Sequence, residues 1–459
     1  MYIQQIYTGC LAQASYYIES MGEAVVIDPI REPEPYIKIA EQRGTKIKYV
    51  FETHFHADFV SGHIDLADKT GAVIVFGPKA KPGYPAYIAR HHERFPVGNC
   101  HIEVLHTPGH TIESTCFLLL DENEKQVAVF TGDTLFVGDV GRPDLMSGNL
   151  GKTELASMLY YSLHGIICKL DDEVIVYPGH GAGSACGKNL GVEKYSTIAD
   201  EKKRNYALQP QTLNKFITVV TSDLPTPPAY FFKDASINII GARHLDDVIK
   251  DSLKFLNIGT FSEEIRKGAL ILDCRSAKNF AEGFIPGSIN IGLNGEFAPW
   301  VGQLIDMDAN ILFITEPGTE KEVVTRLARI GYENIKGTLA GGINMWIQNA
   351  LPLESIENVD AYDFNFLYNT NDYTIIDVRK PAEVAKENIA RTHTIPLSEL
   401  QDRIRELDTN AKYIIYCVGG YRSMIAASIL MSNGIKNVLN VTGGIKSVKE
   451  LVPAMVAVN

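Results

Sequence analysis

A chain of 459 residues is too long for one ordinary hydrophobic core, so we expect two to four domains. Its 45% hydrophobic and 21% charged residues are typical of a soluble globular protein, and no apolar run is long enough to predict a membrane span. The N-terminal MYIQQIYTGCLAQASYYIES lacks the basic start and apolar core of a signal peptide, so a cytoplasmic location is expected. The net charge of −12 argues against a nucleic-acid partner.

Short apolar runs in the first half of the chain predict buried strands that end in polar turns. They occupy residues 24–29, 47–54, 100–110, 126–133 and 173–180. A helix is expected at 34–44. Each strand leads into His or Asp, so we predict one α/β domain with its chemistry on strand-end loops.

Three prolines within TSDLPTPPAYFF (221–232) are expected to end regular structure and to begin a connecting stretch that runs to about residue 250. An internal repeat follows, in which each copy alternates strand and helix. The paired segments are 269–293 with 373–397, and 309–346 with 411–448. We therefore predict two domains with parallel sheets covered by helices on both faces. The expected domains are 1–250, 251–356 and 357–459.

Polar residues with metal-binding side chains gather at the predicted strand ends. His54, His56 and Asp58 occupy alternate positions of one extended segment, so their side chains can converge on one face. Three more follow other strands: His110, Asp133 and His180. Each alone has an ordinary explanation, as a turn residue or a helix cap. Together, six such residues predict a metal site.

The motifs THFHAD, TPGHT, FTGDT and YPGH, in this order, resemble the metallo-β-lactamase fold over roughly residues 1–240. The resemblance implies an αββα sandwich. In two-zinc hydrolases of the glyoxalase II type, a histidine that follows the first aspartate binds the second metal, but Phe59 stands at that position here. Because phenylalanine cannot coordinate a metal, the sequence favours a single ion.

One metal held by two histidines and a carboxylate, with open positions, suits non-heme iron(II) that binds oxygen. Within this fold that description fits the persulfide dioxygenases, which GDTLFVGDVGRPDL (132–145) resembles. The resemblance implies one Fe(2+) per chain, held by His54, His110 and Asp133. Three further residues would orient ligands or water: His56, Asp58 and His180. Zinc relatives, however, use His56 and His180 directly as metal ligands.

The seven cysteines form no Cys-x-x-Cys pair, so neither a zinc finger nor a disulfide framework is indicated, and most are expected to be small buried hydrophobic residues. Cys186 lies six residues after His180, within PGHGAGSACGKNLG (178–191). That loop resembles the corresponding loop of fused persulfide dioxygenase–sulfurtransferases, where such a cysteine takes part in the reaction. A buried structural cysteine is the alternative.

Cys417 opens a loop between a predicted strand and helix in YIIYCVGGYRSMIAASIL (413–430). The Gly-Gly pair lets backbone N–H groups point at the sulfur, and the helix N-terminus and Arg422 add positive potential, which stabilises a thiolate or a persulfide. With IIDVRKPAEV and VTGGIKSV, the segment resembles the rhodanese family over about residues 360–455. The resemblance implies a nucleophilic Cys417; the alternative is an inert cysteine at a strand end.

The first repeat keeps LDCRS and LAGGINMW but has Thr315 in place of Cys417 and Glu320 in place of Arg422. It has neither a nucleophile nor a positive cradle. We therefore expect a rhodanese-like domain without sulfurtransferase activity, serving as a spacer or an interface. Its Cys274 is expected to be structural.

The whole chain resembles bacterial fused persulfide dioxygenase–rhodanese enzymes. This implies that oxygen oxidises a low-molecular-weight thiol persulfide to sulfite, and that Cys417 passes sulfane sulfur to sulfite, giving thiosulfate, or to a thiol. Two alternatives remain: a zinc thioester hydrolase of the glyoxalase II type, and a sulfur carrier or sensor with a structural metal. The first repeat, which lacks the nucleophilic cysteine, makes a homo-oligomer the expected assembly.

Overall fold

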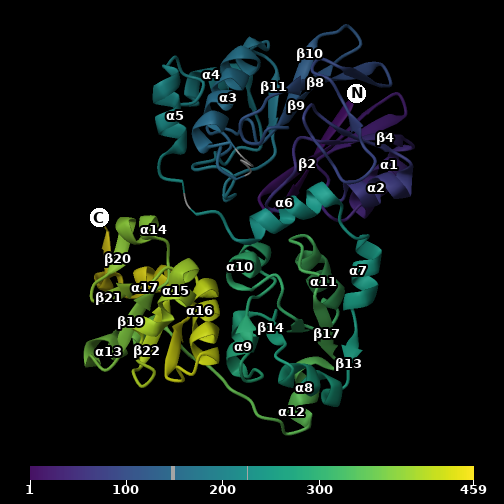
Figure 1. Cartoon of the computed structure of the whole chain (residues 1–459). Coiled ribbons are helices and arrows are strands. Elements are labelled where there is room, and N and C mark those ends of the chain that lie inside the picture. Colours follow the sequence, from purple (N-terminus) through teal and green to yellow (C-terminus); the bar gives the residue numbers. More distant parts are fainter. Residues whose placement is uncertain (146–149, 225, 459) are drawn as a thin grey trace. The chain divides into compact units, whose positions relative to one another are not determined.

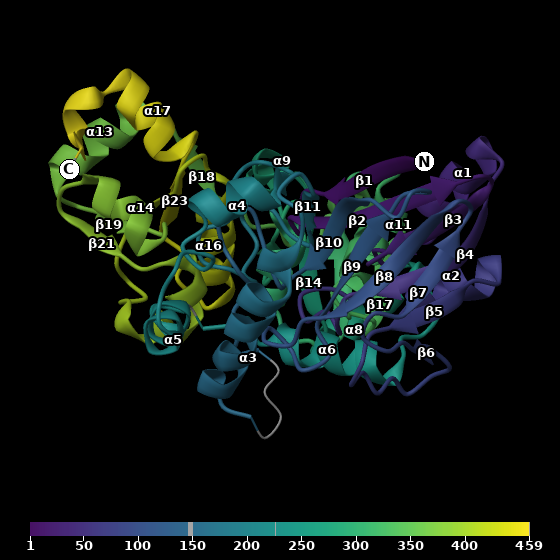
Figure 2. The same ribbon diagram turned by 90° about the horizontal axis from the view of Figure 1, so that it is seen from above.

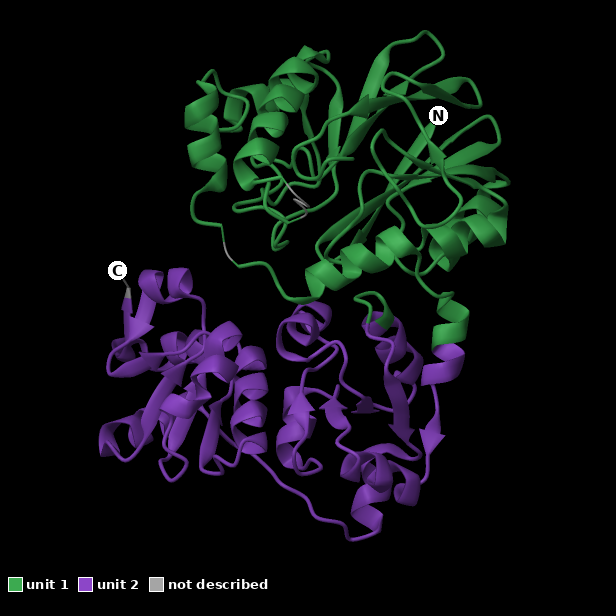
Figure 3. Cartoon of the chain, in the orientation of Figure 1, with its two compact units in different colours: residues 1–248, 328–331 green, residues 249–327, 332–459 purple. Residues whose placement is uncertain are grey.

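The computed structural model describes residues 1–145, 150–224 and 226–458 (Figure 1). The chain divides into two compact units (Figure 3). Unit 1 contains residues 1–248 and 328–331, and unit 2 contains residues 249–327 and 332–459. Among the described residues, no helix has the length and apolar character needed to cross a membrane.

Unit 1 is built on two six-stranded sheets. The first has the order β1 (Tyr2–Thr8), β2 (Gln13–Ser20), β3 (Glu23–Ile27), β4 (Lys46–Glu52), β5 (Val73–Phe76) and β6 (Tyr87–Ile88). The second has the order β12 (Ser196–Thr197), β11 (Ile175–Pro178), β10 (Gln126–Gly132), β9 (Thr115–Leu120), β8 (Cys100–His106) and β7 (Arg94–Val97). Neighbouring strands are parallel from β3 to β6 and between β10 and β11, and antiparallel elsewhere.

Alternate side chains of both sheets form one core between them, as the two-residue period of a strand requires. Helices cover the outer faces, with α1 (Glu34–Arg43) and α2 (His63–Thr70) beside the first sheet, and α3 (Lys152–Gly165) and α4 (Ile198–Arg204) beside the second (Figures 1 and 2). The helix α5 (Leu213–Thr221) packs through Phe216 and Val220 into the core beneath α3. The predicted αββα sandwich is confirmed.

The stretch after residue 221 departs from its prediction. Two helices lie there, α6 (Tyr230–Ile240) and α7 (Leu245–Ser252), where only a connection was expected. The proline signal applies to the few residues before α6; Pro225, on which it partly rests, lies outside the described residues. Beyond the prolines, apolar residues at helical spacing bury one face of α6, and this outweighs the local signal.

Unit 2 contains two five-stranded sheets of parallel strands. The first has the order β13 (Phe255–Leu256), β17 (Ile335–Leu339), β16 (Ile311–Ile314), β14 (Leu270–Asp273) and β15 (Ile289–Asn290). The second has the order β18 (Glu357–Val359), β23 (Val438–Val441), β22 (Tyr413–Tyr416), β19 (Thr374–Asp377) and β21 (Thr392–Thr394). The same order in both sheets confirms the internal repeat and its parallel sheets.

Each sheet of unit 2 has its own helices. Those of the first repeat are α8 (Ile258–Arg266), α9 (Ala277–Glu282), α10 (Phe297–Leu304), α11 (Glu320–Ala328) and α12 (Gly342–Gln348). Those of the second are α13 (Ala361–Thr370), α14 (Pro381–Lys386), α15 (Leu400–Arg403), α16 (Tyr421–Ser432) and α17 (Gly444–Leu451). A short antiparallel pair of strands, β20 (Glu387–Ile389) with β24 (Val456–Val458), completes the second repeat.

A buried ion pair closes the same strand in both repeats. Arg275 Nη2 lies 2.6 Å from Asp273 Oδ2, and Arg379 Nη2 lies 2.7 Å from Asp377 Oδ2. Both guanidinium groups also donate to a backbone carbonyl further along the chain. A buried charge pair with these extra hydrogen bonds is expensive to break from one side. The Asp and Arg of the shared DCRS and DVRK motifs therefore have a structural role in both repeats.

Candidate metal centre and sulfur site

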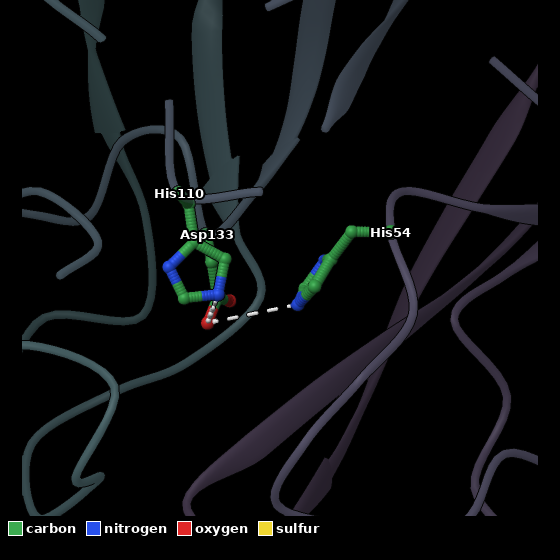
Figure 4. Close-up of side chains that lie close together, drawn as sticks. All are labelled: His54, His110 and Asp133. Atoms are coloured by element: carbon green, nitrogen blue, oxygen red, sulfur yellow. Dashed lines mark ion pairs between the residues drawn. The ribbon is translucent and has the colours of Figure 1, made fainter. Parts of the chain in front are cut away.

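The three predicted metal ligands lie after three different strands and converge on one point (Figure 4). His54 follows β4, His110 follows β8 and Asp133 follows β10. All three are buried, and their donor atoms lie within 4.8 Å of one another. Asp133 Oδ2 is 4.0 Å from His54 Nε2 and 3.5 Å from His110 Nε2. Two imidazoles and one carboxylate therefore face the same small volume.

Hydrogen bonds on the far side of both imidazoles fix the nitrogen that faces this volume. The Thr53 hydroxyl donates to Asp28 Oδ2 at 2.8 Å, so its oxygen accepts from His54 Nδ1 at 2.9 Å. His110 Nδ1 donates to the Arg142 carbonyl at 2.8 Å. In a neutral ring with this hydrogen bond, Nε2 carries the lone pair, which is the form in which histidine binds a metal. Burial lowers the pKa of His54 well below its ordinary value, which keeps this ring neutral.

The Asp133 carboxylate has one oxygen engaged and one oxygen available for a cation. Oδ1 accepts from His180 Nδ1 at 2.9 Å, whereas Oδ2 is buried and has no hydrogen-bond partner among the described residues. Burial opposes ionisation, but the charge of His180 outweighs it and holds the pKa of Asp133 below its ordinary value. An anionic oxygen buried without a partner is costly unless a cation neutralises it. The donor set thus fits a metal ion that accepts nitrogen and carboxylate ligands.

A second group of buried donors lies next to the first and consists of Asp58, His180 and Cys186. His180 Nε2 lies 2.8 Å from Asp58 Oδ2, so the imidazole bridges Asp58 and Asp133. Burial disfavours charge on His180, but the two carboxylates outweigh it and raise the pKa of this ring well above its ordinary value. His180 therefore orients Asp133 through a charged hydrogen bond.

Cys186 is 1% exposed, and its sulfur belongs to this second donor group. Burial raises the pKa of the Cys186 thiol well above its ordinary value, and the carboxylates of Asp58 and Asp133 add to the effect. The sulfur is a neutral thiol, which is a weak nucleophile. Chemistry at Cys186 would need a change in the charge around it.

His56 belongs to a different cluster from the other predicted residues. Its Nε2 lies 3.2 Å from Asp28 Oδ1 and 3.4 Å from Glu52 Oε2. Burial opposes a charge on the ring, yet these carboxylates raise the pKa of His56 to about 10. Protonated imidazole has no lone pair for a metal. Asp28 and Glu52 were not singled out from the sequence, although both end predicted strands and the strand-end pattern could have found them.

The phenylalanine that breaks the two-metal motif is completely buried beside this cluster. The Phe59 ring centroid lies 4.4 Å from that of His56, at an angle of 34°. Asn238, from α6, donates its amide to the carbonyls of His56 and Phe59, each at 2.7 Å, and accepts from Ser61 N at 2.9 Å. Asn238 carries no sequence signal, because it lies far from the motif and in a stretch expected to be irregular.

A cavity of about 240 Å³ opens beside His180. Its walls include Tyr7, Pro178 and Val192, and Glu193 and Lys194 bring charges of opposite sign. Of the second donor group, His180 alone belongs to the lining.

The predicted nucleophile Cys417 lies in a cradle made by its own loop. It follows β22, is 1% exposed, and its sulfur accepts from Gly420 N at 3.1 Å and from the Ser423 hydroxyl at 3.5 Å. Gly420 has a φ of 97°, in the left-handed region that favours glycine, and α16 begins at the next residue. The loop thus directs an N–H group and a helix N-terminus at the sulfur, as the sequence predicts.

Arg422, predicted to be a positive charge for the sulfur, is paired with a carboxylate. Both of its terminal nitrogens donate to the Glu383 carboxylate, at 2.7 and 2.8 Å. The guanidinium charge is therefore compensated by a residue of α14 that the sequence did not single out. In the first repeat, Thr315 Oγ1 pairs with Thr319 Oγ1 at 2.7 Å, so a closed pair of hydroxyls stands in place of the thiol cradle.

Comparison with known proteins places both parts of the chain. Residues 8–180 match the metallo-β-lactamase superfamily, and residues 258–349 and 360–451 each match the rhodanese-like domain. The probable hydroxyacylglutathione hydrolase glo2 of Schizosaccharomyces pombe is 33% identical over 204 residues, covering 39% of this chain and 75% of the relative. The hydroxyacylglutathione hydrolase of Dictyostelium discoideum is 31% identical over 235 residues, covering 50% and 82%.

A solved structure matches more of the chain. The crystal structure of a metallo-β-lactamase from Staphylococcus aureus subsp. aureus COL is 34% identical, with a TM-score of 0.66. The match covers 74% of this chain and 99% of that one.

Proposed function

Because the chain belongs to the metallo-β-lactamase superfamily and carries two rhodanese-like domains, we propose that it is a non-heme iron persulfide dioxygenase coupled to a sulfurtransferase. The overall oxidation is RSSH + O₂ + H₂O → RSH + SO₃²⁻ + 2H⁺, where RSSH is a low-molecular-weight thiol persulfide. The sulfite then reacts with a persulfide on Cys417, which forms by sulfur transfer from RSSH.

The observation that carries the oxidation is the set of His54, His110 and Asp133, with two Nε2 lone pairs and one unpartnered carboxylate oxygen. An iron(II) ion held by these residues would offer open positions to oxygen and to the persulfide. His180 keeps Asp133 in place, and Thr53 keeps His54 in its metal-binding tautomer. These residues prepare the site before any substrate arrives.

The single-metal proposal is supported by Phe59 and by the charge state of its neighbours. Phe59 supplies no donor and excludes water, since its side chain is fully buried. His180 is engaged at both nitrogens, and His56 is a cation paired with Asp28 and Glu52. Two imidazoles that zinc relatives use as ligands are therefore committed to carboxylates.

For sulfur transfer we assign the nucleophile to Cys417. Its thiolate attacks the outer sulfur of a persulfide, a bond forms from Sγ to that sulfur, and the thiol RS⁻ leaves with the electron pair. Sulfite then attacks the outer sulfur of the Cys417 persulfide, which gives thiosulfate and restores the thiolate. The Gly420 N–H and the Ser423 hydroxyl stabilise the negative sulfur in both steps.

The second candidate is a zinc thioester hydrolase of the glyoxalase II type. It is favoured by the names of the two relatives from Schizosaccharomyces pombe and Dictyostelium discoideum, both hydroxyacylglutathione hydrolases. It requires two zinc ions and consumes no oxygen. A sulfur carrier or sensor, with a structural metal, consumes no oxygen and hydrolyses no thioester.

Metal analysis combined with an oxygen electrode separates these candidates. Protein purified without added zinc is expected to contain about one iron per chain, because the His54, His110 and Asp133 group combines two histidine nitrogens with a carboxylate oxygen that has no hydrogen-bond partner. With glutathione persulfide it should consume oxygen and release sulfite, and it should leave S-lactoylglutathione intact. Two tightly bound zinc ions in an active thioester hydrolase would contradict the proposal.

Cys186→Ser tests the neutral thiol beside the metal ligands. If Cys186 accepts sulfur, the ratio of sulfite to thiosulfate should change while the iron content stays that of the wild type, because serine is nearly isosteric and cannot form a persulfide. Cys168→Ser is the matched control, since Cys168 is half-buried in a different part of the domain, within η1 (Ile167–Lys169). A variant that melts at a lower temperature with an unchanged ratio would make Cys186 a structural residue.

A further inference from the structure

A side chain of the Cys417 loop leaves its own repeat and is held by the other one. Tyr421 follows Gly420 and is the first residue of α16. Its hydroxyl donates to the Gly292 carbonyl of the first repeat at 2.8 Å. Its ring lies so close to Gly295 that a Cβ built there would be 2.4 Å from Cζ of the tyrosine. Only glycine at position 295 leaves room for this ring.

The partly buried phenol of Tyr421 is held in this place by its hydrogen bond. Burial raises the pKa of Tyr421 above its ordinary value, so the hydroxyl remains a neutral donor. In an apolar surrounding, such a donor is stable only with an acceptor, and the Gly292 carbonyl is that acceptor.

A second hydrogen bond holds α16 against the first repeat, two turns after Tyr421. Ser428 Oγ accepts from the backbone N–H of Asn290 at 3.0 Å. Tyr421 and Ser428 are seven residues apart, which is two helical turns, so both lie on one face of α16. Met424 and Ile425, between them on that face, are buried. The face of α16 towards the first repeat is thus packed and hydrogen-bonded along its first two turns.

The segment that receives Tyr421 is rigidly anchored within the first repeat. Arg326 of α11 donates to the Leu293 carbonyl at 2.8 Å, and Leu293 N donates to the Cys274 carbonyl at 3.1 Å. The Asn290 amide donates to the carbonyl of Arg275 at 3.0 Å. The DCRS motif of a repeat without a nucleophile therefore holds the surface against which the other repeat rests.

We propose that the first repeat, which has Thr315 in place of the nucleophile, is a positioning element for the sulfur site. Tyr421 is the residue through which it acts. The N–H group of Gly420 that reaches Cys417 Sγ is directly before Tyr421 in the chain, so the place of the Tyr421 ring sets the direction of that N–H. The first repeat thereby stabilises the thiolate and the persulfide of Cys417 without touching either. This inference rests on the proposed sulfurtransferase role of Cys417.

The test measures the reactivity of Cys417 itself, separately from sulfur transfer. Full-length protein is treated with iodoacetamide over a range of pH, and alkylation of the Cys417 peptide is followed by mass spectrometry. Gly295→Val fills the space of the Tyr421 ring from the other repeat, and no left-handed φ at Gly295 forbids the substitution. A misdirected Gly420 N–H stabilises the thiolate less, so the midpoint of the alkylation profile should rise by about one pH unit.

Three variants make the result specific. Tyr421→Ala should shift the profile as Gly295→Val does, and it carries the test if Gly295→Val fails to fold. Tyr421→Phe keeps the ring and should remain near the wild-type profile. Gly283→Ala is the matched control in the first repeat, because its Cβ would meet only Leu353 Cδ1 at 3.9 Å.

The outcomes separate this inference from the proposed function. An unchanged profile in folded Gly295→Val or Tyr421→Ala protein would overturn the positioning role, and so would an equal shift in Gly283→Ala. Wild-type protein that is alkylated readily at Cys417 yet transfers no sulfur would refute the sulfurtransferase instead. The two failures are therefore read from different measurements on the same preparation.

Discussion

Asp133→Ala is expected to abolish oxygen consumption with glutathione persulfide and to reduce bound iron to background. The substitution removes the one carboxylate oxygen that both His54 Nε2 and His110 Nε2 approach, and it takes away a carboxylate partner of His180. Thiosulfate-dependent sulfur transfer by Cys417 should stay close to the wild-type rate, because Cys417 and Asp133 lie in separate domains. The measurements are iron content, oxygen uptake and sulfur transfer on one preparation.

Thr53→Val is the graded companion of this variant. Valine keeps the shape of threonine but loses the hydroxyl that accepts from His54 Nδ1, so the metal-binding tautomer is no longer fixed. Loss of such an orienting bond typically costs about 10–100-fold in metal affinity.

A correctly folded Asp133→Ala protein that loses sulfur transfer together with oxygen consumption would contradict the division of labour between the domains.

Cys417→Ser is expected to eliminate sulfur transfer while oxygen consumption and iron content stay unchanged. A serine hydroxyl is a poor nucleophile towards sulfur and cannot carry a persulfide. The side chain keeps nearly the same volume, so the hydrogen bond from Gly420 N has an oxygen to meet instead of sulfur. Thiosulfate formation from persulfide and sulfite is the quantity to measure.

Thr315→Ala is the matched control in the other repeat. Thr315 follows β16 at the position that Cys417 has after β22, and its hydroxyl is hydrogen-bonded to that of its neighbour Thr319. We expect neither reaction to change. A marked loss of catalysis in this variant would mean that the first repeat has chemistry of its own, beyond a positioning role.

The fold was predictable because its signals are local and repeated. Buried strands read as short apolar runs, and each predicted strand of the N-terminal domain is present within a few residues of its expected bounds. His54, His110 and Asp133 could be picked out for the same reason: each directly follows such a run, and parallel or neighbouring strands bring their ends together. The repeat of unit 2 was visible because both copies keep the strand-closing Asp–Arg pair.

What the sequence missed depends on partners that are distant along the chain. Glu383 neutralises Arg422 from 39 positions away, and nothing local distinguishes it from an ordinary glutamate at a helix start. The direction of His56 was decided by Asp28 and Glu52, whose burial became visible only once the sheets were packed. Short-range patterns identify which residues can do chemistry, whereas tertiary packing selects their partners and their charge.

The amide of Asn238 has a consequence for how the N-terminal metallo-β-lactamase domain can be isolated. The superfamily match ends at residue 180, and the proposed metal ligands His54, His110 and Asp133 all lie before that residue. The carbonyls of His56 and Phe59, however, are held by Asn238, 58 residues beyond that end. A chain shortened to the motif-bearing part would keep all the ligands and lose the clamp on the loop that carries them. The smallest self-sufficient piece therefore includes α6, so excision, fusion or transplantation of this catalytic module has to cut after that helix.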